Sequence, residues 1–201
     1  VNHSNARATV ETGAIRFGLD YVKGIGAEQA EAIVELRGRQ PFRSLADFVQ
    51  RANLDRRAME SLVLAGAFDS LGERRQLLWD LAEAFDIARR PQGLPLQIAD
   101  EHAAMRPMAD DEKLVLTFAT TGVTAGMHLA EVRRDAFARA GCLSYHELQK
   151  KRIGATVKVG GLVADGVRRP PTAHGTAFLR LDTPEGMIDV IVPEEMYLTF
   201  H

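Results

Sequence analysis

The sequence predicts an α+β fold, helical through its first half and β-stranded at its end. From Leu19 onward, apolar residues recur at the spacing of α-helices. From Ala155 onward, the apolar period changes to two, which is typical of strands. Between the two patterns lies a stretch interrupted by Pro91, Pro95 and Pro107, which predicts a linker.

Composition limits the classes of function. The chain has 201 residues, and 46% of them are hydrophobic, enough for one large domain or two small ones. The formal net charge of -2 argues against a surface coated with positive charge, so any contact with nucleic acid must be local. Cys142 is the only cysteine, which excludes an intrachain disulfide and a cysteine-rich zinc site.

The expected location is the cytoplasm. No apolar run approaches the roughly 20 residues that a membrane helix requires, and no secretory leader precedes the first folded segment. The chain begins at Val1 rather than at a methionine and ends at Phe200-His201 without a closing element, so we expect a fragment of a longer protein.

The helical half is expected to form one domain over residues 16–90. Residues 1–15 are polar and lack periodicity, which predicts a lead-in from a preceding domain. A first helical pair spans residues 19–34, and a second pair surrounds residues 53–55, where Asp55 is a candidate N-cap. The same periodicity continues to Arg90.

Residues 19–34 are typical of a helix-hairpin-helix that binds phosphate. Gly24 and Gly26 flank Ile25, and both allow backbone angles and a close approach that a Cβ would obstruct. Gly26 and Ala27 lead into a helix N-terminus, whose free amides favour an anion, and Lys23 can add a direct charge. Such donors point at the backbone, so binding would not depend on base sequence. The alternative is an ordinary helical hairpin that contains two glycines.

The second pair has no glycine in its hairpin. Arg56 and Arg57 follow that hairpin and could make weaker phosphate contacts. The alternative is a solvated basic turn.

The second half is expected to contain a linker, a connector and a barrel. The linker covers residues 91–109, a helical connector covers 110–152, and a partial OB-fold covers 153–201. Strands are expected around Val157 and Val159, from Ala177 to Leu181 and from Ile188 to Val192, followed by a helix after Pro193. This order opens an OB barrel, a fold that often holds single-stranded nucleic acid. Since a closed barrel needs five strands, the predicted barrel is truncated.

Several residues of the barrel are candidates for binding a DNA strand. Arg168, Arg169 and His174 lie in the first connection, where they could follow a phosphate backbone. Phe178 and Arg180 share one strand face, so Phe178 could stack on a base. The alternative is that Phe178 packs against protein.

The residues also resemble a known family, the C-terminal part of bacterial C-family replicases: the alpha subunit of DNA polymerase III and especially its error-prone relatives. The first half carries Val1-Asn2-His3-Ser4, Ile15-Arg16-Phe17-Gly18-Leu19, Lys23-Gly24-Ile25-Gly26, Pro41-Phe42, Ala65-Gly66-Ala67-Phe68-Asp69, Arg74-Arg75-Gln76 and Trp79. The second half carries Arg169-Pro170, Thr172-Ala173, Gly175, Phe178, Leu181-Asp182 and Gly186. The chain departs from the family at Asn5-Ala6, where Trp-Asp is common, at His128-Leu129, where His-Pro is common, and at His174, where lysine is common.

The resemblance implies part of a DNA-directed DNA polymerase, a nucleotidyltransferase of DNA replication and repair synthesis. Its active site would lie upstream, in a palm domain that uses paired aspartates and magnesium. No such site is expected in this chain, because the carboxylates of 110–112, Asp182 and Asp189 do not converge on one point. Cys142 and His146 alone do not make a zinc site. We therefore expect no catalytic residue, metal or cofactor here.

Two functions remain open. The first is a DNA-holding module that grips duplex DNA, with single-stranded template as a further ligand. The second is a protein-interaction module that docks a sliding clamp or the partners of a mutagenesis complex. Its candidate is Gln92-Gly93-Leu94-Pro95-Leu96, which loosely resembles clamp-docking peptides, although stray leucines are also common in linkers.

Overall fold

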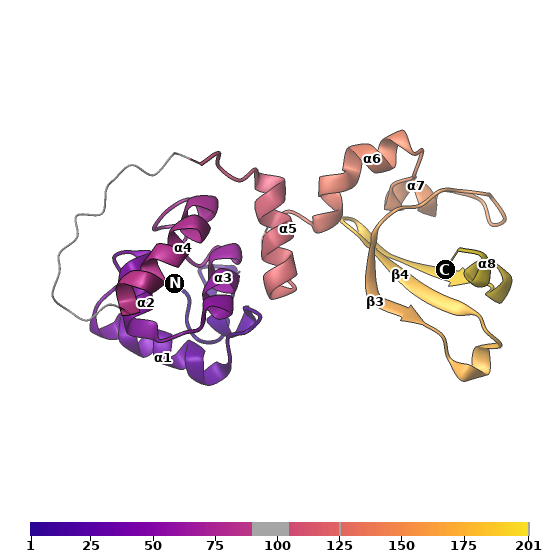
Figure 1. Cartoon of the computed structure of the whole chain (residues 1–201). Helices are drawn as coiled ribbons and strands as arrows, with labels where there is room; N and C mark the ends of the chain where they lie inside the picture. The colour runs from indigo at the N-terminus through magenta and orange to yellow at the C-terminus, as the bar shows by residue number, and fades with distance from the viewer. Residues whose placement is uncertain (90–104, 125, 201) are drawn as a thin grey trace. The chain divides into compact units, whose positions relative to one another are not determined.

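The computed structural model describes residues 1–89, 105–124 and 126–200 (Figure 1). The chain divides into two compact units, Val1–Thr124 and Ala125–His201. Unit 1 contains β1 (Thr9–Glu11), β2 (Ala14–Arg16), η1 (Leu19–Tyr21), α1 (Ala27–Arg39), α2 (Leu45–Ala52), α3 (Arg56–Leu64), α4 (Arg74–Arg89) and α5 (Asp110–Thr121). Unit 2 contains η2 (Leu129–Arg133), α6 (Arg134–Arg139), α7 (Tyr145–Gln149), β3 (Leu162–Arg168), η3 (Pro171–Ala173), β4 (Ala177–Thr183), β5 (Gly186–Val192) and α8 (Glu194–Phe200).

Three phenylalanines form the centre of unit 1. Phe42, Phe48 and Phe68 are all buried, and Phe48 contacts the other two rings edge-on at centroid distances of 4.7 and 4.9 Å. Helices α2 and α3 begin at capping side chains, Ser44 and Asp55. The Asp55 carboxylate accepts the Ala58 amide at 2.7 Å, which confirms the predicted N-cap of α3.

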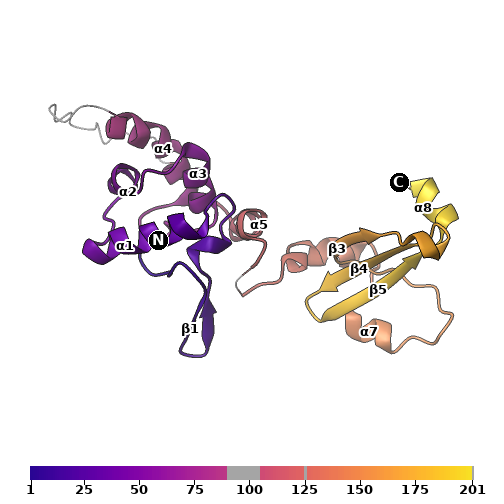
Figure 2. The ribbon, with the colours of Figure 1, turned by 90° about the horizontal axis from the view of Figure 1, so that it is seen from below.

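The first residues of the chain belong to unit 1. Val1 is 6% exposed, and the Asn2 side chain exchanges two hydrogen bonds with the Phe42 backbone, at 2.8 and 3.0 Å. Residues 9–16 form the β1–β2 hairpin, which extends away from the helices of this unit (Figure 2). The polar lead-in predicted for residues 1–15 is therefore structured, and strands of three residues are too short to give a period-two signal.

Helix α5 also belongs to unit 1, although the sequence placed it in a connector over residues 110–152. Arg74, only 7% exposed, holds it through hydrogen bonds to the Thr117 hydroxyl at 2.8 Å and the Lys113 carbonyl at 3.3 Å. The same guanidinium forms a bidentate pair with Asp69, with both distances 2.8 Å. Arg74 thus fastens α5 to the turn between α3 and α4.

Unit 2 is built on an antiparallel sheet in the order β3-β4-β5. The second and third predicted strands are confirmed as β4 and β5, and α8 follows Pro193 as expected. The first strand begins later than predicted, at Leu162, because residues 157–159 make only one isolated bridge, from Val159 to Leu143. The pair Gly160-Gly161 interrupts the pattern, and the Phe137 ring occupies the place of a Cβ at Gly160.

The sheet does not close. Within the described ranges of unit 2, no further strand pairs with β3 or β5, so the structure supports a three-stranded sheet and not a closed OB barrel. Strand β3 carries an irregularity between Ala164 and Arg168, where Asp165 and Gly166 have φ angles of +57° and +70°.

None of the helices in the described ranges has the length and apolar character that a membrane span requires.

Candidate nucleic-acid interface

The predicted hairpin lies between η1 and α1. Its first element is a single 3₁₀ turn over Leu19–Tyr21 and not the α-helix that the periodicity predicted. The apolar residues of both elements are nonetheless anchored in the core. Those that are at most 6% exposed are Leu19, Val22, Ile25, Ala30 and Ile33.

The two glycines of the hairpin have different roles. Gly24 has a φ angle of +89°, in a region that favours glycine, and a Cβ there would meet open space. Gly26 has an ordinary extended backbone, and its amide donates to the Gln29 side chain at 2.9 Å. The turn therefore requires glycine at position 24, whereas the amide of Gly26 is already occupied.

Lys23 also has hydrogen-bond partners within unit 1. Its backbone amide donates to the Thr120 carbonyl at 2.8 Å, and its ammonium donates to the Ala119 carbonyl at 2.6 Å. These are carbonyls at the negative end of the α5 dipole, which a lysine stabilises. The charge that the sequence assigned to a phosphate thus caps α5 in this structure.

Other backbone donors of the hairpin are open. Among the described residues, the amides of Gly24, Ala27 and Glu28 donate to no protein acceptor. Ala27 and Glu28 belong to the first turn of α1, a 13-residue helix whose positive end favours an anion. The Glu28 carboxylate lies in the same turn and opposes an incoming phosphate.

In the second hairpin, one arginine has no carboxylate partner among the described residues. Arg56 pairs with Glu60 on α3 at 2.9 Å, whereas Arg57 is exposed and forms no ion pair with any described residue. The hairpin turns at Asn53, whose φ angle is +44°.

Three of the candidates in unit 2, Arg168, Phe178 and Arg180, line one depression along the sheet, but both arginines are paired with carboxylates. Phe178 lies opposite Arg168 on β3 and Ile191 on β5, and Arg180 lies opposite Asp189. The Arg180 guanidinium contacts the Asp189 carboxylate at 2.8 Å, which raises the pKa of Arg180. A shallow depression of about 280 Å³ follows this face, and Phe178 is 37% exposed beside it.

The connection between β3 and β4 is held in a similar way. Arg168 contacts Asp165 at 3.4 Å, and the Arg169 guanidinium lies 4.4 Å above the Tyr197 ring. His174 ends the η3 turn with a φ angle of +47°. Strand pairing brings Asp189 to Arg180, so the sequence did not indicate that pair. Asp165 precedes Arg168 by three residues on β3 and reaches it at the irregularity of this strand.

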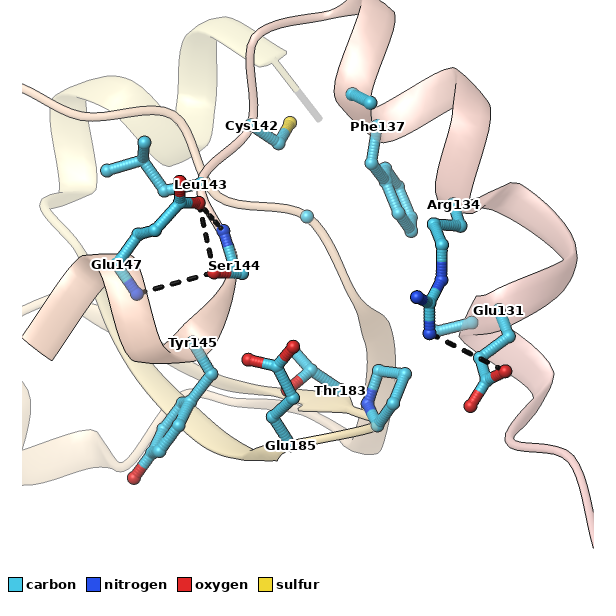
Figure 3. A pocket seen from close by; sticks show the side chains of 14 residues that line it. Glu131, Arg134, Phe137, Cys142, Leu143, Ser144, Tyr145, Glu147, Thr183 and Glu185 are labelled. Atoms are coloured by element: carbon cyan, nitrogen blue, oxygen red, sulfur yellow. Dashed lines mark hydrogen bonds and ion pairs between the residues drawn. The ribbon is translucent and has the colours of Figure 1, made fainter.

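Unit 2 also contains a pocket of about 240 Å³ that the sequence did not predict (Figure 3). Arg134 and Phe137 of α6 line it opposite Glu185 of the β4–β5 turn. The His146 ring contacts Glu185 at 2.8 Å, and Ser144 donates to Glu147 at 2.9 Å. These hydrogen bonds lower the pKa of both Glu185 and Glu147.

The hydrogen bonds that line the pocket therefore fix the start of α7. Its two hydrogen-bonded carboxylates are held as charged acceptors, which does not suit a general acid. In the described ranges, no three His, Cys, Asp or Glu side chains are grouped so that they could hold a metal ion.

Comparison with known proteins shows which proteins this chain is similar to. Residues 1–78 match the family model described as a helix-hairpin-helix motif. Error-prone DNA polymerases align with nearly the whole chain: that of Symbiobacterium thermophilum is 35% identical over 92% of it, that of Corynebacterium diphtheriae 37% over 96%, and that of Cutibacterium acnes 36% over 89%. The chain is a relative of the error-prone DNA polymerases.

The chain spans less than one fifth of the length of these relatives. It covers 19%, 18% and 16% of the lengths of these three relatives. The resemblance predicted from the residues is confirmed, and the helix-hairpin-helix match contains the hairpin at residues 23–26.

Proposed function

We propose that this chain is a DNA-holding segment of an error-prone DNA polymerase and that the hairpin of unit 1 grips the phosphates of duplex DNA. The observation that carries the proposal is the turn at Gly24, which leaves the amides of Gly24, Ala27 and Glu28 open at the positive end of α1. Nucleotidyl transfer would occur elsewhere in the enzyme, at a magnesium site outside this chain.

Lys23 has two partners in this proposal. Without DNA, its ammonium caps α5 through Ala119. With DNA, the side chain turns to the phosphate, whose full charge attracts it more strongly than a carbonyl does. The backbone amide of Lys23 remains on Thr120, so α5 stays attached.

The sheet face of unit 2 is proposed to hold single-stranded template in the manner of an OB-type domain. Phe178 would stack on a base, and Arg168 and Arg180 would exchange their carboxylate partners for phosphates. This exchange costs little free energy, because exposed ion pairs stabilise a protein by only about 0–1 kcal/mol.

The alternative, a module that docks a sliding clamp, depends on Gln92–Leu96, which lies outside the described residues. Capture by a sliding clamp that is lost in a Leu94→Ala/Leu96→Ala variant would support it. Capture that is equal in both proteins would exclude this peptide.

The DNA proposal is tested by titrating the chain against a labelled duplex at two salt concentrations. The test variant is Gly26→Asp, since aspartate is a good N-cap for the extended backbone at this position but places a carboxylate at the phosphate site. The matched control is Ala32→Asp, which adds the same charge to an exposed position of α1.

We expect Gly26→Asp to weaken duplex binding about 10-fold relative to Ala32→Asp and to lower the salt slope by about 0.9, the contribution of one phosphate. Equal affinity of the two variants would contradict the proposed grip.

A further inference from the structure

A basic turn, defined here as Lys150–Gly154, projects from unit 2. It lies within eight successive exposed residues from Gln149 to Thr156, between α7 and β3 (Figure 1). The turn is nevertheless ordered by its backbone: the amides of Lys150, Lys151 and Ala155 donate to the carbonyls of Glu147, Leu148 and Arg152 at 3.2, 3.0 and 3.1 Å. Gly154 reverses the chain with a φ angle of +86°.

The charges of the basic turn are unpaired. Lys150, Lys151 and Arg152 form no ion pair or side-chain hydrogen bond with any described residue. The charge of Lys151 helps to lower the pKa of Glu147, but the Glu147 carboxylate is hydrogen-bonded to Ser144. Three adjacent cations therefore face solvent in a chain whose net charge is -2.

The lack of ion pairs with any described residue distinguishes the basic turn from the basic residues of the sheet. Arg168 and Arg180 are each paired with an aspartate, so a phosphate must displace a carboxylate to reach them. A phosphate at the basic turn displaces only water and counterions, whose release favours binding.

An apolar side chain stands next to these cations. Ile153 is fully exposed, the most exposed large hydrophobic residue of the described chain. Cations beside an unburied apolar side chain fit a ligand that offers negative charge and apolar surface together. Single-stranded DNA has both, because its bases are unstacked and accessible beside the phosphates, whereas duplex DNA encloses its base faces.

We propose that the basic turn is a contact site for single-stranded DNA, with Lys150, Lys151 and Arg152 on phosphates and Ile153 against a base or deoxyribose. The inference rests on the proposed DNA-holding function and adds a site outside the sheet face. An acidic protein surface would match the charges but not the exposed isoleucine.

The test measures the affinity of the full chain for a labelled oligo-dT strand by fluorescence anisotropy across a salt series. The first variant is Lys150→Gln/Lys151→Gln/Arg152→Gln. Its matched control, Arg106→Gln/Arg133→Gln/Arg139→Gln, removes the same charge from three exposed residues outside the proposed contacts. The second variant is Ile153→Ala, which cannot disturb a core because the side chain is fully exposed.

We expect the basic-turn triple variant to bind the strand at least 10-fold more weakly than its control and to lose about 2 from the salt slope, as for three single-strand phosphates. Ile153→Ala should weaken binding several-fold with an unchanged slope. Equal affinities of the triple variant and its control would overturn the inference. So would competition by poly-glutamate at the same charge concentration, combined with no effect of Ile153→Ala.

The Gly26→Asp titration against duplex DNA separates this result from the proposed function. If Gly26→Asp weakens duplex binding while the basic-turn variant matches its control, only the inference fails. If the unmodified chain binds neither duplex nor single strand, both fail.

Discussion

Replacing Arg74 with methionine should release α5 and destabilise unit 1. The guanidinium is 7% exposed and donates to Asp69, the Leu64 carbonyl, Lys113 and Thr117. Methionine fills much of the same volume but leaves these acceptors without a donor. The variant therefore removes the polar network with little change in packing.

The loss in free energy of unfolding depends on how exposed the acceptors of Arg74 are. Removing one partner of a fully buried ion pair costs about 3–5 kcal/mol. The Asp69 side chain is 48% exposed and can regain water, whereas the Leu64 carbonyl lies in the junction. We expect a loss near the lower limit, about 3 kcal/mol, which corresponds to about 10 °C in the melting temperature of a unit of this size.

Urea unfolding followed by far-UV circular dichroism measures this loss, because most helical residues lie in unit 1. Asp69→Asn is the control: it keeps the shape of the partner and should cost about 1 kcal/mol. Hydrogen exchange should show the α5 amides opening first in Arg74→Met. A loss below about 1 kcal/mol, or unchanged exchange in α5, would refute the role of Arg74 as the fastening of this helix.

Two further predictions concern the hairpin and the pH response of unit 2. Gly24→Ala should cost about 1 kcal/mol in urea unfolding through its backbone angle alone, since a Cβ there meets open space; a neutral result would remove the argument for glycine at this turn. In unit 2, hydrogen bonds lower the pKa of Glu185 and Glu147 below the ordinary value of 4.5. These carboxylates therefore contribute stability above the ordinary glutamate pKa and lose it as the pH falls through their lower folded values. Glu185→Gln should flatten that part of the stability profile, followed by NMR on the α7 amides, and an unchanged profile would show that the pair with His146 is not maintained in solution.

The sequence predicted the elements whose signals are local. The position of the hairpin, the N-cap at Asp55, strands β4 and β5 and the helix after Pro193 each depend on neighbouring residues. The three-residue spacing of Leu19 and Val22 fits both an α-helix and a 3₁₀ turn, so the pattern alone does not distinguish the two.

The remaining features depend on residues that are far apart in the chain. Lys23 and Ala119 are 96 positions apart, and no pattern in either segment indicates that one caps the other. The hydrogen bonds of Arg74 to Lys113 and Thr117, 39 and 43 positions away, likewise arise from the fold. The basic turn could have been noticed in the sequence as three cations before Ile153 and Gly154, but its lack of acidic partners is visible only in the structure.

The most direct test of the DNA grip is NMR of the chain during titration with duplex DNA at low salt. The account predicts that the amide signals of Gly24, Ala27 and Glu28 shift most, that the Lys23 side chain moves from Ala119, and that added salt reverses these changes. If the duplex binds while these amides keep their signals, the hairpin is not the grip, and the central claim is contradicted.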